Sequence, residues 1–174
     1  PAMITCPETE TPRMHEDPAG FPIDSPSRSW QRSLQTAVRD LDELARQLAR
    51  GAIDAINEIV YDTVNNGVYR AGFATTQSAY EAAFERLFET LDELEARLAR
   101  QRYLVDEHIT EADWRLFTTL VRFDAVYHGH FKCNRNRLVD FPNLWAFTRE
   151  LYQWPRVAET VNLQHIKHHY YRSC

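Results

Sequence analysis

The sequence predicts an all-α fold, in which a helical bundle follows a short, irregular, proline-rich leader. Six of the eight prolines lie in the first 26 residues, and none occurs between residues 27 and 141. Only four glycines fall within residues 27–174. Apolar residues in this long segment recur at intervals of three and four, the period of a helix with one buried face. A segment with so few turn-forming residues does not suit a β-sandwich or a chain of βαβ units.

Composition excludes several classes of function. The net charge is −5 and the isoelectric point is about 5.8, so the chain lacks the basic surface that binds nucleic acid or anionic lipid. No apolar run approaches the ~20 residues of a membrane span, and the N-terminal residues lack the pattern of a signal peptide. Three widely separated cysteines do not form a disulfide framework. We therefore expect a cytoplasmic protein that contacts neither nucleic acid nor membrane.

The first elements follow from apolar spacing. Residues 1–27 combine proline with few apolar anchors and are expected to be irregular, whereas residues 28–174 form the bundle. Gly51 is expected to end or kink the first helix. A second helix should end at Asn65-Asn66-Gly67, a turn or C-cap signal. The two apolar stripes are Trp30, Leu34, Val38, Leu41, Leu44, Leu48, and then Ile53, Ile56, Val60, Val64.

Two further helices have explicit start signals. Thr75 or Thr76 can cap a third helix, whose broad apolar face runs from Tyr80 to Leu98. Thr110 and Asp113 have the spacing of a capping box for a fourth helix, which continues toward Tyr127. Ile109 and Trp114 occupy the positions of a hydrophobic staple around that box.

Proline marks the limits of a fifth helix. Asp140-Phe141-Pro142 opens it with proline in the first turn, and Trp154-Pro155 closes it. A last helix should run from about Val157 toward Tyr170. The sequence therefore predicts a bundle of five to seven helices.

The chain carries no self-sufficient catalytic motif, such as a phosphate-binding glycine loop or a nucleophile elbow. Two histidine groups could hold a metal, namely His128, His130 and Cys133, and then His165, His168 and His169. Neither group has a standard spacing or an evident fourth ligand, and histidine is also stabilised near a helix C-terminus. We therefore predict no metal site, with a metal-binding helical protein as a lesser alternative.

Tyrosines form a second candidate group. Tyr69, Tyr127, Tyr170 and Tyr171 fall near predicted helix ends rather than within apolar stripes. A tyrosine at a helix end commonly packs its ring and leaves its hydroxyl in water. The functional alternative is a hydroxyl cluster that donates hydrogen bonds to an anion or transfers a proton. Spacing alone leaves both interpretations open.

Four longer blocks are distinctive: YDTVNNGVYRAGFATTQ (61–77), TEADWRLFTTLVRFD (110–124), YHGHFKCN (127–134) and HIKHHYYR (165–172). They resemble the C-terminal domain of glutathionyl-hydroquinone reductases, which are also called Xi-class glutathione transferases. The resemblance covers about residues 50–174. It implies a helical bundle of the kind found in glutathione transferase C-terminal domains.

The resemblance also implies an activity. In this family a thioredoxin-like N-terminal domain binds glutathione as co-substrate and carries a nucleophilic cysteine. That cysteine attacks the sulfur of a glutathionyl-hydroquinone and releases hydroquinone, and a second glutathione resolves the mixed disulfide. The helical domain supplies the quinone pocket. By resemblance, Tyr69 is the proton donor and acceptor, while Tyr127 and Tyr170 lower the pKa of the catalytic cysteine through hydrogen bonds.

The N-terminal part departs from this pattern. The residues before the helical region are too few for a thioredoxin-like domain and read as loop and helix. Cys6, in Thr-Cys-Pro-Glu, shares only Cys-Pro with the family motif, and we interpret it as coincidental. We therefore expect the isolated chain to have little reductase activity. The alternative function is a non-catalytic helical interaction module, and in either case we expect a homo-oligomer such as a dimer.

Overall fold

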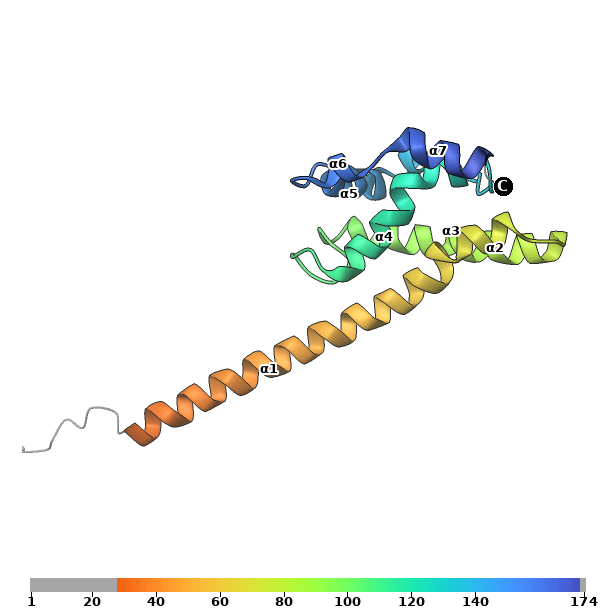
Figure 1. The fold of residues 1–174 in the computed structure, drawn as a ribbon. Helices are drawn as coiled ribbons and strands as arrows, with labels where there is room; N and C mark the ends of the chain where they lie inside the picture. Colours follow the sequence, from red (N-terminus) through yellow and green to blue (C-terminus); the bar gives the residue numbers. More distant parts are fainter. Residues whose placement is uncertain (1–27, 173–174) are drawn as a thin grey trace, which may run out of the picture. The chain divides into compact units, whose positions relative to one another are not determined.

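The computed structural model describes residues 28–172, with side chains from residue 33 onward. All regular structure in this range is helical (Figure 1), which confirms the predicted fold class. The predicted leader, residues 1–27, lies outside the described residues, and so does Cys6, which we interpreted as coincidental. The α-helices are α1 (Arg28–Ile59), α2 (Gly67–Gly72), α3 (Gln77–Leu98), α4 (Glu111–Arg122), α5 (Pro142–Tyr152), α6 (Val157–Thr160) and α7 (Leu163–Arg172).

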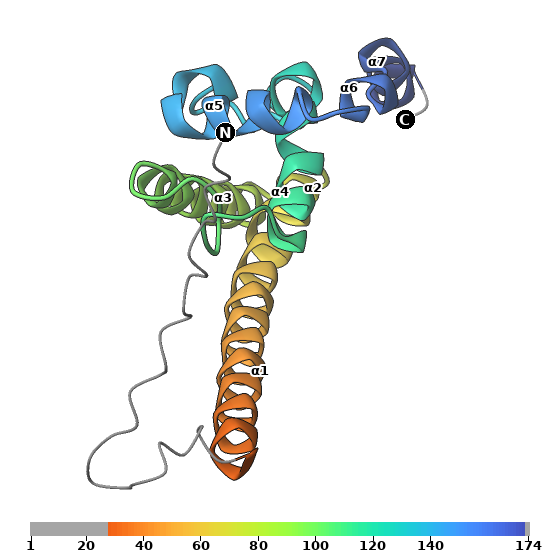
Figure 2. The ribbon, with the colours of Figure 1, turned by 90° about the vertical axis from the view of Figure 1, so that its left-hand side faces the viewer.

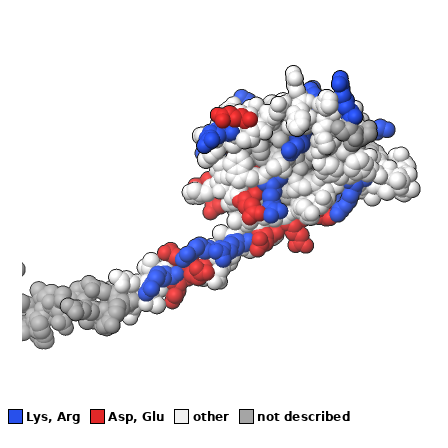
Figure 3. Space-filling view, viewed as in Figure 1, with Lys and Arg blue, Asp and Glu red and all other residues white. Residues whose placement is uncertain are grey.

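The chain divides into two compact units, with the boundary after Asp42. In the described part of the first unit, α1 leaves Leu34, Val38 and Leu41 exposed. Acidic and basic side chains alternate along α1 in the face seen in Figure 3. The second unit holds the hydrophobic core and all of the remaining helices.

The first helix is longer than the sequence predicts. Gly51 does not end the helix, because α1 continues through it to Ile59 as one element. A glycine inside a helix costs only about 1 kcal/mol relative to alanine, and the neighbouring alanine, leucine and arginine residues favour the helix. The chain then passes through a π-helical segment, Val60–Asn65. The predicted end at Asn65-Asn66-Gly67 is confirmed, since the π-helical segment stops at Asn65, Asn66 is its C-cap, and Gly67 begins the separate helix α2.

The third helix begins as predicted and also organises the fifth. Thr76 is its N-cap, and the Thr76 hydroxyl accepts a hydrogen bond of 3.2 Å from the Ala79 N–H. α2 packs beside α3 (Figures 1 and 2), and α3 also contacts α5. The Glu95 carboxylate accepts hydrogen bonds from the backbone N–H groups of Asn143 (2.8 Å) and Leu144 (2.7 Å). A carboxylate from α3 therefore caps α5, which starts at Pro142 as predicted.

The predicted capping box at α4 is confirmed. The Asp113 side chain accepts from the Thr110 N–H at 2.7 Å and from the Thr110 hydroxyl at 2.8 Å. It also accepts from the Leu104 N–H at 2.8 Å, nine positions back in the chain. Asp113 is completely buried, so these donors replace the water that a carboxylate would otherwise require. The contact fixes the loop before α4 to its first turn.

The predicted last helix is two helices. α6 stops at Thr160, and α7 begins after Asn162, whose side-chain oxygen accepts from the His165 N–H at 2.9 Å. Asn162 therefore acts as an N-cap, and this local signal starts a separate helix where one continuous helix was predicted. α7 then packs against the π-helical segment Phe123–Tyr127, which follows α4.

The core is formed by apolar side chains from the predicted stripes of the second unit. No described helix is long and apolar enough to span a membrane. The largest buried side chains are at most 2% exposed. They are Tyr127, Phe88, Phe123, Leu87, Leu91, Leu104, Leu116, Leu120, Leu144 and Leu151.

Candidate functional site

The structure brings together three of the four tyrosines singled out from the sequence. The hydroxyl oxygens of Tyr69 and Tyr170 are 2.6 Å apart. The Tyr127 hydroxyl lies 3.1 Å from that of Tyr170 and 3.3 Å from that of Tyr69. All three pairs are within hydrogen-bonding distance, so the phenols form a triangle, which we call the tyrosine cluster. Tyr171 is not part of it and is 50% exposed.

Each phenol comes from a different element. Tyr69 lies in α2, Tyr127 is the last residue of the π-helical segment Phe123–Tyr127, and Tyr170 lies in α7. The Phe131 ring is shared by all three, with ring centroids at 5.4 Å from Tyr69, 5.5 Å from Tyr127 and 5.8 Å from Tyr170. Gly72 allows this packing, because a Cβ atom there would lie 2.3 Å from the Phe131 ring. An aromatic residue therefore supports the cluster from within the core.

Burial favours the neutral form of two of the three phenols, Tyr127 and Tyr170. Burial is the largest cause that raises the pKa of Tyr127, and the hydrogen bonds to Tyr170 and Tyr69 raise it further. Burial also raises the pKa of Tyr170, and the charge of Arg122 opposes that increase. Removing a phenol from water disfavours its charged form, so these hydroxyls stay protonated and can donate hydrogen bonds.

The two π-helical segments are tied to neighbouring parts of the fold. The Asn65 side-chain amide donates to the Arg115 carbonyl at 3.1 Å and to the Thr119 hydroxyl at 2.6 Å. This joins the segment before α2 to the middle of α4. The Asp124 carboxylate accepts from the Leu138 N–H and, at 3.3 Å, from the Val139 N–H.

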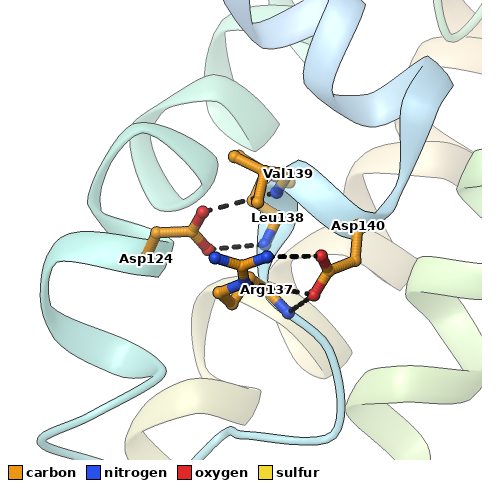
Figure 4. A network of polar contacts seen from close by, with 5 residues as sticks. All are labelled: Asp124, Arg137, Leu138, Val139 and Asp140. Atoms are coloured by element: carbon orange, nitrogen blue, oxygen red, sulfur yellow. Dashed lines mark hydrogen bonds and ion pairs between the residues drawn. The ribbon is translucent and has the colours of Figure 1, made fainter.

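Figure 4 shows the contacts of Asp124 beside those between Arg137 and Asp140. The carboxylate of Asp124 faces the backbone that begins a short turn at Leu138, and Arg137 bonds to Asp140 beside it. The Arg137–Asp140 hydrogen bond is 2.9 Å and joins side chains that are both exposed, so its energy is small. The Asp124 contacts join the segment that carries Tyr127 to the turn that precedes α5.

A shallow depression of about 480 Å³, largely open to solvent, lies beside the tyrosine cluster, and we call it the cavity. Tyr69 and Tyr127 line it, together with Tyr61, Trp114 and Arg122. Its other polar lining residues are Asn65, Asn66, Glu111, Arg115, Thr118 and Thr119. The cavity thus combines aromatic walls with phenol and guanidinium donors.

The residues considered as possible metal ligands have other surroundings. Cys133 is buried, and burial raises the pKa of its thiol to about 12, so it stays protonated at neutral pH. No group of three or more histidine, cysteine or acidic side chains with metal-binding geometry occurs within the described range. His130 instead packs against Tyr171, with ring centroids 4.9 Å apart. Its environment is aromatic.

Comparison with known proteins agrees with this architecture. Residues 77–150 match the family model of the glutathione S-transferase C-terminal domain. The chain is 60% identical over 124 residues to the glutathionyl-hydroquinone reductase PcpF of Sphingobium chlorophenolicum, covering 71% of this chain and 40% of the relative. It is 57% identical over 121 residues to the glutathionyl-hydroquinone reductase YqjG of Escherichia coli, covering 70% of this chain and 37% of that protein.

Solved structures give the same result. The glutathione-bound structure of Escherichia coli YqjG superposes with a TM-score of 0.69 at 57% identity, covering 70% of this chain and 39% of that one. The Xi glutathione transferase of Phanerochaete chrysosporium gives 0.69 at 54% identity, covering 71% and 42%. The helical body is a glutathione S-transferase C-terminal domain. The chain spans about two fifths of the length of these relatives, and the matched part of the transferase fold is its helical domain.

Within this transferase domain, the sequence located the tyrosines but not their surroundings. Arg122 was not predicted as a site residue, because an arginine at the end of a helix commonly interacts with the helix dipole. Trp114 was assigned only to a staple, although it also lines the cavity. The hydrogen bond from Asn65 to Thr119 spans 54 positions, and no local sequence pattern predicts it.

Proposed function

We propose that this chain provides the aryl-binding half of an enzyme that reduces glutathionyl-hydroquinones with glutathione. The tyrosine cluster beside an aromatic cavity is the observation that carries the proposal. The similarity to two glutathionyl-hydroquinone reductases supports the reaction class. Glutathione is the proposed co-substrate, which is consistent with the glutathione-bound structure of the Escherichia coli relative.

In the proposed reaction, a cysteine thiolate attacks the sulfur atom of the glutathionyl-hydroquinone. A sulfur–sulfur bond forms, the bond between that sulfur and the ring carbon breaks, and the ring carbon takes a proton. The thiolate of a second glutathione then attacks the mixed disulfide, which releases glutathione disulfide and regenerates the cysteine thiolate. The buried Cys133 does not suit the nucleophile's role, because its thiol is protonated and shielded. We assign that role to a thioredoxin-like domain, as in the family.

Donor counting favours Tyr69 as the proton donor and acceptor. Each phenol has a single O–H, so a closed triangle of three hydrogen bonds uses every donor. A ligand can accept a hydrogen bond from the cluster only if one of the three phenol–phenol hydrogen bonds breaks. The contact between the hydroxyl oxygens of Tyr69 and Tyr127, at 3.3 Å, is the longest of the three. Tyr127 is 2% exposed, whereas Tyr69 is half-buried and lines the cavity. Tyr69 is therefore the phenol best placed to exchange its bond for one to substrate.

We assign Tyr127 and Tyr170 a supporting role. Phenol donors directed at a thiolate stabilise its charged form and so lower the pKa of the cysteine. Both residues remain protonated in their buried environment, as this role requires. The role depends on a docked domain that brings the cysteine sulfur to the cluster.

The function is tested by grafting. The matching helical segment of this chain replaces that of the Escherichia coli relative, and glutathione-dependent reduction of a glutathionyl-hydroquinone is measured. We expect turnover, and we expect Tyr69→Phe to lower kcat by roughly 10²-fold or more because it removes the proton donor. Tyr152→Phe is the control, since Tyr152 is a half-buried tyrosine that lines a different cavity. A folded graft without activity, or equal effects of the two substitutions, would contradict the proposal.

The isolated 174-residue chain is the second arm of this test. We expect almost no turnover from it without a separate thioredoxin-like domain. Robust activity that Cys6→Ser abolishes would overturn the assignment of the nucleophile to another domain.

We also propose that the chain self-associates and resides in the cytoplasm. Large apolar side chains of α1 are at least 48% exposed, namely Leu34, Val38, Leu41, Leu44 and Leu48. Exposed apolar groups of this size favour association. Light scattering should give a mass above that of one chain, and a uniform monomer would contradict the proposal. The cytoplasm suits chemistry that consumes reduced thiols, which cell fractionation tests.

A further inference from the structure

The charges that line the cavity are unequal. Glu111 and Arg115 form an ion pair across one turn of α4, with the Arg115 Nε donating to the Glu111 carboxylate at 2.7 Å. Their charges therefore compensate each other. Arg122 lines the same cavity, and no carboxylate among residues 33–172 forms an ion pair with it. The cavity keeps one uncompensated positive charge.

Arg122 has donors available for a ligand. Its guanidinium donates one hydrogen bond to the Thr118 carbonyl, one turn earlier in α4. A guanidinium has five N–H donors, so this contact leaves most of them unused. The side chain is only half-buried, and its other donors can reach the cavity that it lines.

The same charge acts on the tyrosine cluster. Arg122 ends α4 and immediately precedes the segment that carries Tyr127. Its positive charge favours the ionised form of the Tyr170 phenol, whose oxygen lies 2.6 Å from that of Tyr69. A negative oxygen placed beside Tyr69 would therefore meet both the phenol donors and the guanidinium.

A purely structural role for Arg122 is the competing explanation. A cation at a helix C-terminus interacts favourably with the last carbonyl groups, and the contact with Thr118 fits that role. Such a role would affect stability without affecting the choice of ligand. The aromatic cavity and the adjoining phenols are what distinguish the two explanations.

We propose that Arg122 binds the oxygen of an ionised phenol, so that the cavity prefers an aryloxide to a neutral aromatic molecule of the same size. The inference rests on the proposed function in taking this cavity as the aryl site. Trp114 and Tyr61 supply aromatic surface for the ring, and Tyr69 and Arg122 supply donors for the oxide. For a hydroquinone substrate, the preferred form is the monoanion.

The test compares 4-nitrophenolate with 4-nitroanisole, a methyl ether of similar size that cannot ionise. Binding to the full chain is measured by equilibrium dialysis, at a pH above the pKa of the free phenol and without glutathione. We expect the phenolate to bind about tenfold more tightly, because hydrogen bonds to a charged acceptor are the stronger ones. Added salt should reduce the preference, since the site is partly open to solvent.

Three variants separate the explanations. Arg122→Gln should remove most of the preference, and Arg122→Lys should retain part of it through the charge. Arg149→Gln is the matched control, because Arg149 is an exposed arginine of α5 that lines a different cavity. Melting temperatures establish that each variant is folded. An unchanged preference in folded Arg122→Gln, or an equal loss in Arg149→Gln, would overturn the inference.

The failure of this inference is distinguishable from that of the proposed function. Selective aryloxide binding by the chain, together with an inactive graft, would refute the reductase function and leave the role of Arg122 intact. An active graft with the same kcat and KM after Arg122→Gln would support the function and overturn the inference.

Discussion

Replacing Asp113 should destabilise the helical domain more than any exposed carboxylate would. Asp113→Ala removes three hydrogen bonds to a fully buried charge and strands the N–H of Leu104, a residue that is itself completely buried. An unsatisfied buried donor costs about 1–3 kcal/mol, and losing a helix cap costs about 1 kcal/mol more. Water can replace part of the loss at Thr110, which is half-buried. The free energy of unfolding should therefore fall by about 3 kcal/mol.

Urea unfolding, followed by circular dichroism and by tryptophan fluorescence, measures this change, and coincident transitions justify a two-state treatment. In a domain of this size the melting temperature should fall by roughly 6–12 °C. Asp106→Ala is the control, because Asp106 is exposed and bonds only the neighbouring Glu107 N–H, at 2.8 Å. We expect the control to stay within about 0.5 kcal/mol of the parent chain. A loss below about 1 kcal/mol for Asp113→Ala would refute the reasoning.

Three further predictions concern the site and its support. Burial raises the pKa of Tyr127 above its usual 10.0, so the stability that this phenol contributes is complete below about pH 10 and falls as the pH rises beyond that. Urea unfolding at alkaline pH should show this loss of stability, and Tyr127→Phe should make the stability depend less on pH. Gly72→Ala should lower the free energy of unfolding by about 1–3 kcal/mol, because its Cβ would clash with Phe131. Gly51→Ala, in open space within α1, should raise it by up to about 1 kcal/mol. Urea unfolding measures both changes. Cys133 should resist alkylation until the chain unfolds, because burial raises its thiol pKa to about 12; peptide mass spectrometry reads the modified site, and rapid labelling of the folded chain would contradict this.

Local sequence signals predicted the start of several helices correctly. Thr76, Thr110 with Asp113, and Pro142 each act through contacts within a few residues, so spacing and residue type were sufficient. The errors arose where a local signal competed with a longer pattern. Gly51 was outweighed by strong helix formers on both sides, so α1 continues through it.

Other parts of the site depend on contacts that no local pattern encodes. Glu95 caps α5 across 48 positions, and Tyr69 meets Tyr170 across 101 positions. These contacts exist only after α2, α3, α5 and α7 have packed, so spacing alone left the role of the tyrosines undecided. The resemblance to a known family supplied the role that we propose, and the geometry shows that the hydroxyls of Tyr69, Tyr127 and Tyr170 lie close together.

The tyrosine cluster by itself favours an anionic ligand, which agrees with the positive charge of Arg122. Opening the weakest phenol contact sacrifices a neutral hydrogen bond, with a net value of about 1 kcal/mol. A neutral ligand oxygen would form a neutral hydrogen bond of the same kind, so the net gain in binding free energy would be small. An oxide or thiolate would return a charge-assisted bond, which is roughly twice as strong. Because burial keeps the phenols of Tyr127 and Tyr170 protonated, the cluster remains a set of donors at neutral pH. Both the exchange of hydrogen bonds and the charge of Arg122 therefore select for a negative oxygen or sulfur beside Tyr69.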